Sequence, residues 1–305
     1  MTGQFRLQGI VTALVTPFSS TGQIEEESLR EIIRFQLKSG IHGFFGLGTT
    51  GMGPAMSLEQ RKRVAQVLVE ETDGRVPVIV QVGASDPRTS LELAAHAQRI
   101  GADAIASLTP FYYHPDEAAI IDYYEKLSQV TTIPLFVYNI PSHTGNNVEA
   151  NLLLKLSKIP NVVGIKDSSR DFSQLLDYLQ VIPEGFNIIV GTDSYLFSAL
   201  CAGANGGVSA TSNAFPELFV EMYEAYRSRN FDRGKTLQLK LHAVRTAVNE
   251  PPIAPLLEIL RLRGLKSGLV KPPLRSLSAT EVASLRASVN RVLPELGLAS
   301  QSALS

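Results

Sequence analysis

The stretch of sequence that decides the fold runs Asn161-Val162-Val163-Gly164-Ile165-Lys166-Asp167. Its apolar part shows no alternation, which is typical of a parallel strand that is covered on both faces. The strand closes on a single amine, Lys166, and α/β folds and barrels keep their chemistry at the carboxyl ends of their strands. Burial disfavours the charged form of an amine, so Lys166 is a candidate nucleophile. Alone, a lysine at a strand end is more often a solvated cap.

Seven further apolar runs, each followed by a helical pattern, repeat along the chain. They begin near Ile10, Gly43, Pro77, Asp103, Pro134, Asn187 and Gly206. Strands that alternate with helices predict βαβ units and a parallel sheet, and eight units predict a closed (β/α)8 TIM barrel. The main alternative is a doubly wound sheet, which usually carries a glycine-rich dinucleotide turn after its first strand. Val15-Thr16-Pro17-Phe18 is no such turn.

The helical segments have recognisable ends. Ser57-Leu58-Glu59-Gln60 has the pattern of a capping box, and Gly40 and Gly101 suit positions just past a helix. From Pro216 to about Leu296 the pattern is helical throughout, although only one of these helices is needed to complete the barrel. We therefore expect a barrel over residues 1–228 and a C-terminal helical extension over residues 229–305, packed on the barrel as one structural unit.

Composition limits the partners and the compartment. The 305 residues are 44% hydrophobic and 19% charged, with a net charge of −1, so nothing favours binding to nucleic acid or to an acidic membrane. There is no apolar run of 18 residues for a membrane span and no signal-peptide pattern. The single cysteine, Cys201, excludes an internal disulfide and fits a reducing cytosol, so we expect a cytoplasmic protein. Its apolar helical surroundings predict that it packs in the core.

The histidines give no indication of a metal site. They occur at positions 42, 96, 114, 143 and 242, and neither His-x-x-x-His nor Cys/His spacing is present. We therefore expect no metal held by the protein.

Polar residues follow the predicted strands at their carboxyl ends, where a barrel gathers its catalytic groups. These positions hold Thr49, Thr50, Tyr112, Tyr138, Lys166, Asp193 and Ser209. The set suits carbonyl chemistry based on an amine, with a phenol that can move protons and hydroxyl donors for a carboxylate. Each residue alone has a purely structural explanation, but their convergence on one rim of the barrel favours a catalytic site.

Four blocks with their order and spacing resemble one family. They are Gly48-Thr49-Thr50-Gly51, Thr109-Pro110-Phe111-Tyr112-Tyr113, Tyr138-Asn139-Ile140-Pro141 with Thr144-Gly145, and Gly164-Ile165-Lys166-Asp167. The chain, from about Gly9 to Leu296, resembles the class I pyruvate-dependent aldolases and lyases. That family includes dihydrodipicolinate synthase, N-acetylneuraminate lyase and 2-keto-3-deoxygluconate aldolase. The resemblance implies a TIM barrel in which Lys166 forms a Schiff base with pyruvate, without a metal or a cofactor.

The same resemblance implies roles for other residues. Thr49 and Thr50 would bind the pyruvate carboxylate, Gly191 and Val208 would complete the pyruvate site, and Tyr138 would relay protons. Tyr112 matches the family tyrosine that reaches into a neighbouring subunit, which implies a homo-oligomer, typically a tetramer built from tight dimers.

Departures from the family pattern bear on the substrate. Dihydrodipicolinate synthases usually have an arginine where this chain has His143, and histidine is a weaker anion ligand whose charge depends on pH. Met52-Gly53-Pro54 resembles the 2-keto-3-deoxygluconate aldolase branch. Asp193 resembles both that branch and the sialic acid lyases, in which it would contact a sugar hydroxyl, and Ser209 could supply a further contact. Some aldolases of that branch bind a substrate phosphate with an arginine in the loop after the fourth strand. This chain has the carboxylate of Asp116 at about that place, so an unphosphorylated substrate is favoured here.

We therefore expect a lyase that reversibly cleaves a 2-keto-3-deoxy sugar acid, such as 2-dehydro-3-deoxy-D-gluconate, to pyruvate and an aldehyde. The enzyme alternatives are 4-hydroxy-tetrahydrodipicolinate synthase, N-acetylneuraminate lyase, and a 2-keto-3-deoxy acid dehydratase that uses the same imine. The alternative of another class is a catalytically silent barrel with a binding role, against which Lys166 and Tyr138 argue, because a silent barrel needs neither.

Overall fold

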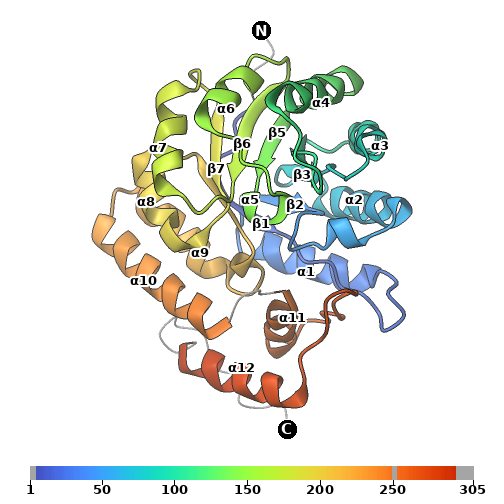
Figure 1. The fold of residues 1–305 in the computed structure, drawn as a ribbon. Coiled ribbons are helices and arrows are strands. Elements are labelled where there is room, and N and C mark those ends of the chain that lie inside the picture. The colour runs from blue at the N-terminus through green and yellow to red at the C-terminus, as the bar shows by residue number, and fades with distance from the viewer. Residues whose placement is uncertain (1–4, 249–252, 293–305) are drawn as a thin grey trace.

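The eight predicted runs form the strands of one closed parallel barrel (Figure 1). The computed structural model describes residues 5–248 and 253–292. Each strand pairs with the next along the chain, and the first pairs with the last. The strands are β1 (Gly9–Ala13), β2 (Gly43–Gly46), β3 (Val78–Gln81), β4 (Ala104–Leu108), β5 (Leu135–Asn139), β6 (Val162–Asp167), β7 (Asn187–Val190) and β8 (Gly206–Ser209). The predicted (β/α)8 TIM barrel is confirmed.

Helices surround the barrel. They are α1 (Glu26–Lys38), α2 (Leu58–Thr72), α3 (Pro87–Arg99), α4 (Glu117–Val130), α6 (Ala150–Leu156), α7 (Phe172–Val181), α8 (Leu196–Ala202) and α9 (Pro216–Arg227). The capping box is present, because the Ser57 hydroxyl accepts from Gln60 N and the Gln60 side chain accepts from Ser57 N. Gly40 and Gly101 have φ of +80° and +83° just past α1 and α3, as predicted.

Alternation along each strand divides the core into two parts. Residues that face into the barrel form an inner apolar cluster, which includes Phe45, Ile79, Phe136, Tyr138 and Val208. Residues that face outward pack against the helices in a larger cluster. Because successive side chains on a strand point to opposite faces, one position decides whether a side chain lies inside the barrel or behind its wall.

The C-terminal extension contains α10 (Phe231–Val248), α11 (Ile253–Leu262) and α12 (Ala279–Val292). It lies along one side of the barrel, below α8 and α9 in Figure 1. The prediction that this region is helical throughout is wrong for residues 263–278. Gly264 and Gly268 have φ of +84° and +59° there, and Pro272–Pro273 cannot continue a helix. Residues 249–252 and those after 292 lie outside the described residues.

Two other features complete the fold. Cys201 is exposed, so the prediction that it packs in the core is wrong. The short helix α8 turns Leu196, Phe197, Ala199 and Leu200 inward and leaves Cys201 on its outer side. Within the described part of the chain, no helix is long and apolar enough to cross a membrane.

Candidate active site

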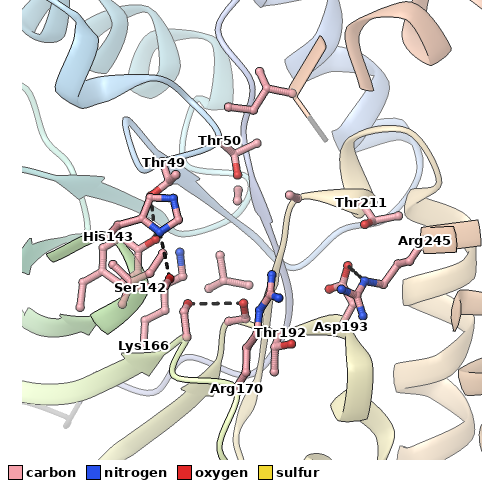
Figure 2. A pocket seen from close by; sticks show the side chains of 18 residues that line it. Thr49, Thr50, Ser142, His143, Lys166, Arg170, Thr192, Asp193, Thr211 and Arg245 are labelled. Atoms are coloured by element: carbon pink, nitrogen blue, oxygen red, sulfur yellow. Dashed lines mark hydrogen bonds and ion pairs between the residues drawn. The ribbon is translucent and has the colours of Figure 1, made fainter. Parts of the chain in front are cut away.

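A cavity of about 400 Å³ opens where the strands end (Figure 2). Its volume is in the range of small-molecule sites. The residues that line it come from the ends of β1, β2 and β5 to β8, from the loops that follow them, and from the extension. They are Ala13, Thr49, Thr50, Tyr138, Ile140, Ser142, His143, Lys166, Ser168, Arg170, Gly191, Thr192, Asp193, Val208, Ala210, Thr211, Arg245 and Ile253.

Lys166 projects into this cavity from the end of β6. Its side chain is buried, and Nζ lies 4.0 Å from the centre of the Phe45 ring and 3.9 Å from the centre of the Tyr138 ring. Burial lowers the pKa of Lys166 to about 7, because the ammonium loses its hydration. Ring faces attract a cation and favour the ammonium form, so they oppose this effect. Near neutral pH a substantial share of Lys166 is therefore the neutral amine that can attack a carbonyl.

Tyr138 lies beside Lys166 in the sheet, since the two residues are paired in the register of β5 and β6. The phenol oxygen is 3.2 Å from Thr49 Oγ1, and either atom can donate. Burial raises the pKa of Tyr138 to about 12, and hydrogen bonds from Thr49 and Ser168 lower it in part. A phenol with such a pKa keeps its proton at neutral pH, so it can pass a proton along only by receiving another.

Thr49 and Thr50 occupy a tight turn after β2. The turn needs glycine, because a Cβ on Gly53 would lie 1.9 Å from Leu47 O, and one on Gly51 would lie 2.8 Å from Leu14 O. Both threonines line the cavity, as expected from the sequence.

The neighbouring strands β7 and β8 supply the next part of the wall. Gly191 and Val208 line the cavity, and a Cβ on Gly191 would lie 2.0 Å from Ser168 Oγ. Ser209 does not line the cavity, which contradicts the expectation that it contacts substrate. Its hydroxyl is buried behind the wall, where it accepts from Ser212 N at 3.1 Å. Val208 takes the inward position on β8, so the next side chain must face away.

His143 lies in the short helix α5 (Pro141–Thr144), which follows β5. Its Nδ1 is 3.0 Å from the hydroxyl of Ser142, and both side chains line the cavity. Since Ser142 occupies Nδ1, the ring can offer its Nε2 to a ligand.

Asp193 opens the short 3-10 helix η2 (Asp193–Tyr195) after β7. Its carboxylate is 4.0 Å from Nε of Arg245, which comes from α10 in the extension (Figure 2). Gln238 of α10 also donates to the Asp193 carbonyl at 2.8 Å. The extension therefore fixes the loop that carries Asp193.

Tyr112 does not line the cavity within one chain. Its side chain is 82% exposed, and its φ of +80° is strained for a residue that is not glycine. The ring packs edge to face on Tyr113, which is exposed as well. One chain alone thus leaves this pair of rings largely uncovered.

Several lining residues are absent from the sequence prediction: Ser142, Ser168, Arg170, Thr192, Thr211 and Arg245. Ser168 and Arg170 follow Lys166 so closely that inspection of the whole loop, rather than of the strand end, could have found them. Arg245 lies within α10 and not at the end of a strand, so the rule that catalytic residues follow strand ends gives no signal for it.

The arrangement can form and stabilise an imine. A neutral lysine adds to a ketone, and the protonated imine withdraws electrons, so that a neighbouring carbon can carry carbanion character. Tyr138 and Thr49 supply a path for the proton. Among residues 5–248 and 253–292, no cluster of three or more His, Cys, Asp or Glu side chains could hold a metal ion.

Comparison with known proteins agrees with this chemistry. The sequence model of the dihydrodipicolinate synthetase family matches residues 6–292 of this chain. The chain belongs to this family. A 4-hydroxy-tetrahydrodipicolinate synthase of Methanopyrus kandleri is 34% identical over 301 residues, which cover 96% of this chain and 99% of that protein.

Solved structures of the dihydrodipicolinate synthetase family have the same fold. YagE, a prophage protein of this family from E. coli K12 in complex with pyruvate, superposes with a TM-score of 0.90 at 28% identity, covering 96% of this chain and 99% of YagE. A monomeric dihydrodipicolinate synthase variant gives 0.89 at 32% identity, covering 96% and 98%. As a family member, the protein is a metal-independent class I carbon–carbon lyase of the kind that acts on pyruvate and an aldehyde. The nearer resemblance to the 2-keto-3-deoxygluconate branch stays a prediction.

Proposed function

We propose that the chain reversibly cleaves a 2-keto-3-deoxy sugar acid, such as 2-dehydro-3-deoxy-D-gluconate, to pyruvate and an aldehyde. The observation that supports this substrate class is the cavity wall formed by Thr192, Asp193 and Thr211, which lies away from Lys166 in Figure 2. Hydroxyl and carboxylate oxygens on such a wall can bond to the hydroxyl groups of a sugar chain. In addition, this chain has His143 two residues after Pro141, where most dihydrodipicolinate synthases have an arginine.

In the proposed reaction, Lys166 adds to the C2 ketone and expels water to form a protonated imine. Thr49 and Thr50 bind the carboxylate, while Gly191 and Val208 line the pyruvate end. Tyr138 takes the proton of the C4 hydroxyl as it passes its own proton to Thr49, and Thr49 releases its hydroxyl proton to solvent. The transfers are coupled because the raised pKa of the phenol disfavours a free phenolate.

The C3–C4 bond then breaks, its electron pair forms the enamine, and the aldehyde leaves. Protonation at C3 and hydrolysis of the imine release pyruvate and restore the amine.

A side-by-side assay tests the substrate class. We expect kcat/KM for cleavage of 2-keto-3-deoxygluconate to exceed that for condensation of pyruvate with aspartate semialdehyde by at least about tenfold, or about 1.4 kcal/mol. Asp193→Asn should reduce the sugar-acid reaction while pyruvate remains trapped on Lys166 by borohydride. The reverse ranking of the two substrates would exclude the proposal.

One observation favours a second candidate, 4-hydroxy-tetrahydrodipicolinate synthase. Arg170 lines the cavity, so a cation is available there although His143 replaces the usual arginine. Arg170 also interacts within the protein, which reduces what it can offer a substrate carboxylate. His143→Arg tests this candidate. If aspartate semialdehyde is the natural partner, the variant should not improve on the wild type, whereas a sugar-acid aldolase should gain condensation with aspartate semialdehyde.

We also propose a cytoplasmic homo-oligomer, a tetramer of tight dimers, in which Tyr112 completes the site of a neighbouring chain. The exposure of the Tyr112 and Tyr113 rings supports this assembly. Mixing inactive Lys166→Ala and Tyr112→Phe subunits should restore activity if the subunits exchange, because some sites then contain both wild-type residues. A fully active monomer in sedimentation would exclude it.

A further inference from the structure

Behind the catalytic pair lies a second pair of side chains. Tyr138 pairs with Lys166 in the register of β5 and β6, and the next residues, Asn139 and Asp167, pair in the same way. Since successive side chains alternate between the two faces, the first pair projects into the barrel and the second lies behind its wall. Asn139 Nδ2 donates to Asp167 Oδ1 at 2.8 Å, and both residues are buried.

We propose that Asn139 and Asp167 act as a positioning pair, which holds Tyr138 and Lys166 at the separation that proton transfer requires. This inference goes beyond the substrate proposed above, because it concerns the imine and enamine steps that pyruvate alone undergoes.

Among residues 5–248 and 253–292, the partners of the Asp167 carboxylate are hydrogen-bond donors, and none is a salt-bridge partner. Ser169 Oγ donates to Oδ2 at 2.7 Å, and Ser169 N and Gln174 Nε2 approach Oδ1 at 3.3 and 3.5 Å. Burial raises the pKa of the Asp167 carboxyl, while the bonds from Ser169 and Asn139 lower it. A buried carboxylate is expensive unless it is well bonded, so the loss of one donor should displace it.

The pair also joins three loops that line the cavity. Val148 N donates to Asn139 Oδ1 at 3.0 Å, which ties in the segment that follows His143. Ser168 N donates to the Asn139 carbonyl at 2.8 Å, and Gly191 N donates to the Asp167 carbonyl at 2.6 Å. A shift of this pair would therefore move both strand ends that carry the catalytic residues.

Deuterium exchange into pyruvate measures the step that should depend on the pair. In the imine, a C3–H bond breaks, and its proton leaves to solvent through Tyr138 and Thr49. The electron pair of that bond forms the C2=C3 bond, while the iminium π pair returns to nitrogen. A deuteron from solvent then forms C3–D, so no other reactant is required. Loss of the pyruvate methyl signal in D2O gives the rate, and borohydride trapping counts the sites that form an imine.

We expect Asp167→Asn and Asn139→Asp to slow exchange per trapped site by at least about tenfold, because small misplacements of reacting groups are costly. The doubly substituted protein should recover to within about threefold of the wild type, since it restores one amide and one carboxylate. The proposal would be overturned if the two single variants exchanged at the wild-type rate per trapped site. It would also be overturned if the double variant exchanged no faster than the slower single variant.

Two further variants guard against trivial loss of folding. Asn187→Asp is the matched control, because Asn187 is a buried amide at the first residue of β7, the end away from the catalytic residues. Its Oδ1 accepts from Leu7 N at 2.9 Å, and its Nδ2 donates to Val163 O at 2.8 Å. It should lower stability and leave exchange per trapped site unchanged, and an equal slowing there would refute a specific role for the pair. If Asp167→Asn fails to fold, Ser169→Ala replaces it as the test, because it removes one donor to Asp167. We expect about threefold slower exchange per trapped site, and an unchanged rate would overturn the proposal.

Discussion

Lowering the pH below about 7 should slow imine formation at Lys166. Burial lowers the pKa of this amine from 10.5 to about 7. One pKa unit corresponds to about 1.4 kcal/mol, so the loss of hydration amounts to about 5 kcal/mol. A solvated lysine would have only about one neutral amine in 2500 at pH 7, whereas about half of Lys166 is neutral there.

The rate of trapping by cyanoborohydride, at pyruvate well below saturation, follows this titration. Because only the neutral amine attacks the ketone, the rate constant should rise about tenfold per pH unit below pH 7 and level off above it. Between about pH 5.5 and the plateau the expected change is about thirtyfold. Lys166→Ala serves as the control, and mass spectrometry should find the label on Lys166 alone in the wild type.

A rate that continues to rise tenfold per unit up to about pH 9 would refute this reasoning, because it would describe an amine that keeps its hydration. Label on another lysine would remove Lys166 from the mechanism altogether.

Three other outcomes follow from the site. Tyr138→Phe should still trap pyruvate but lose about 10² to 10⁴-fold in turnover, and a variant that keeps more than about a tenth of the activity would place the proton relay elsewhere. Lys166→Met should raise the free energy of unfolding by up to about 5 kcal/mol at pH 6, as measured by urea denaturation. The folded-state pKa lies below the unfolded value, so this gain should shrink as pH rises from about 7 to 10.5; a constant gain would contradict it. Gly53→Ala should raise KM for pyruvate, because its Cβ would meet Leu47 O at 1.9 Å and displace the threonine turn, and an unchanged KM would exclude this effect.

The sequence predicts the barrel well because its signals are local and repeated. Each strand is a short apolar run, each helix has recognisable ends, and their alternation leaves few topologies. The same regularity locates Lys166, Tyr138 and Thr49, since parallel strands bring their carboxyl ends together. Cys201 shows the limit: an apolar segment predicts a buried helix, but in seven residues it does not determine which side faces out.

Other parts of the site depend on contacts between distant segments. Arg245 reaches the cavity because α10 packs on the barrel and Gln238 binds the loop after β7. Such docking depends on the shapes of whole elements, which no motif encodes. The role proposed for Tyr112 could not be tested within one chain, because its side chain is exposed and does not line the cavity.

Ser209 and Asp167 illustrate one rule with opposite consequences. Both lie at the end of a strand, one residue beyond an inward side chain, so alternation turns both away from the cavity. For Ser209 this removes an expected contact with substrate. For Asp167 it creates a buried support that pairs with Asn139 directly behind Tyr138 and Lys166. The two-residue period of a strand thus lets neighbouring positions serve chemistry on one face and geometry on the other. A substitution at Asn139 or Asp167 should therefore change turnover, although neither side chain contacts the substrate.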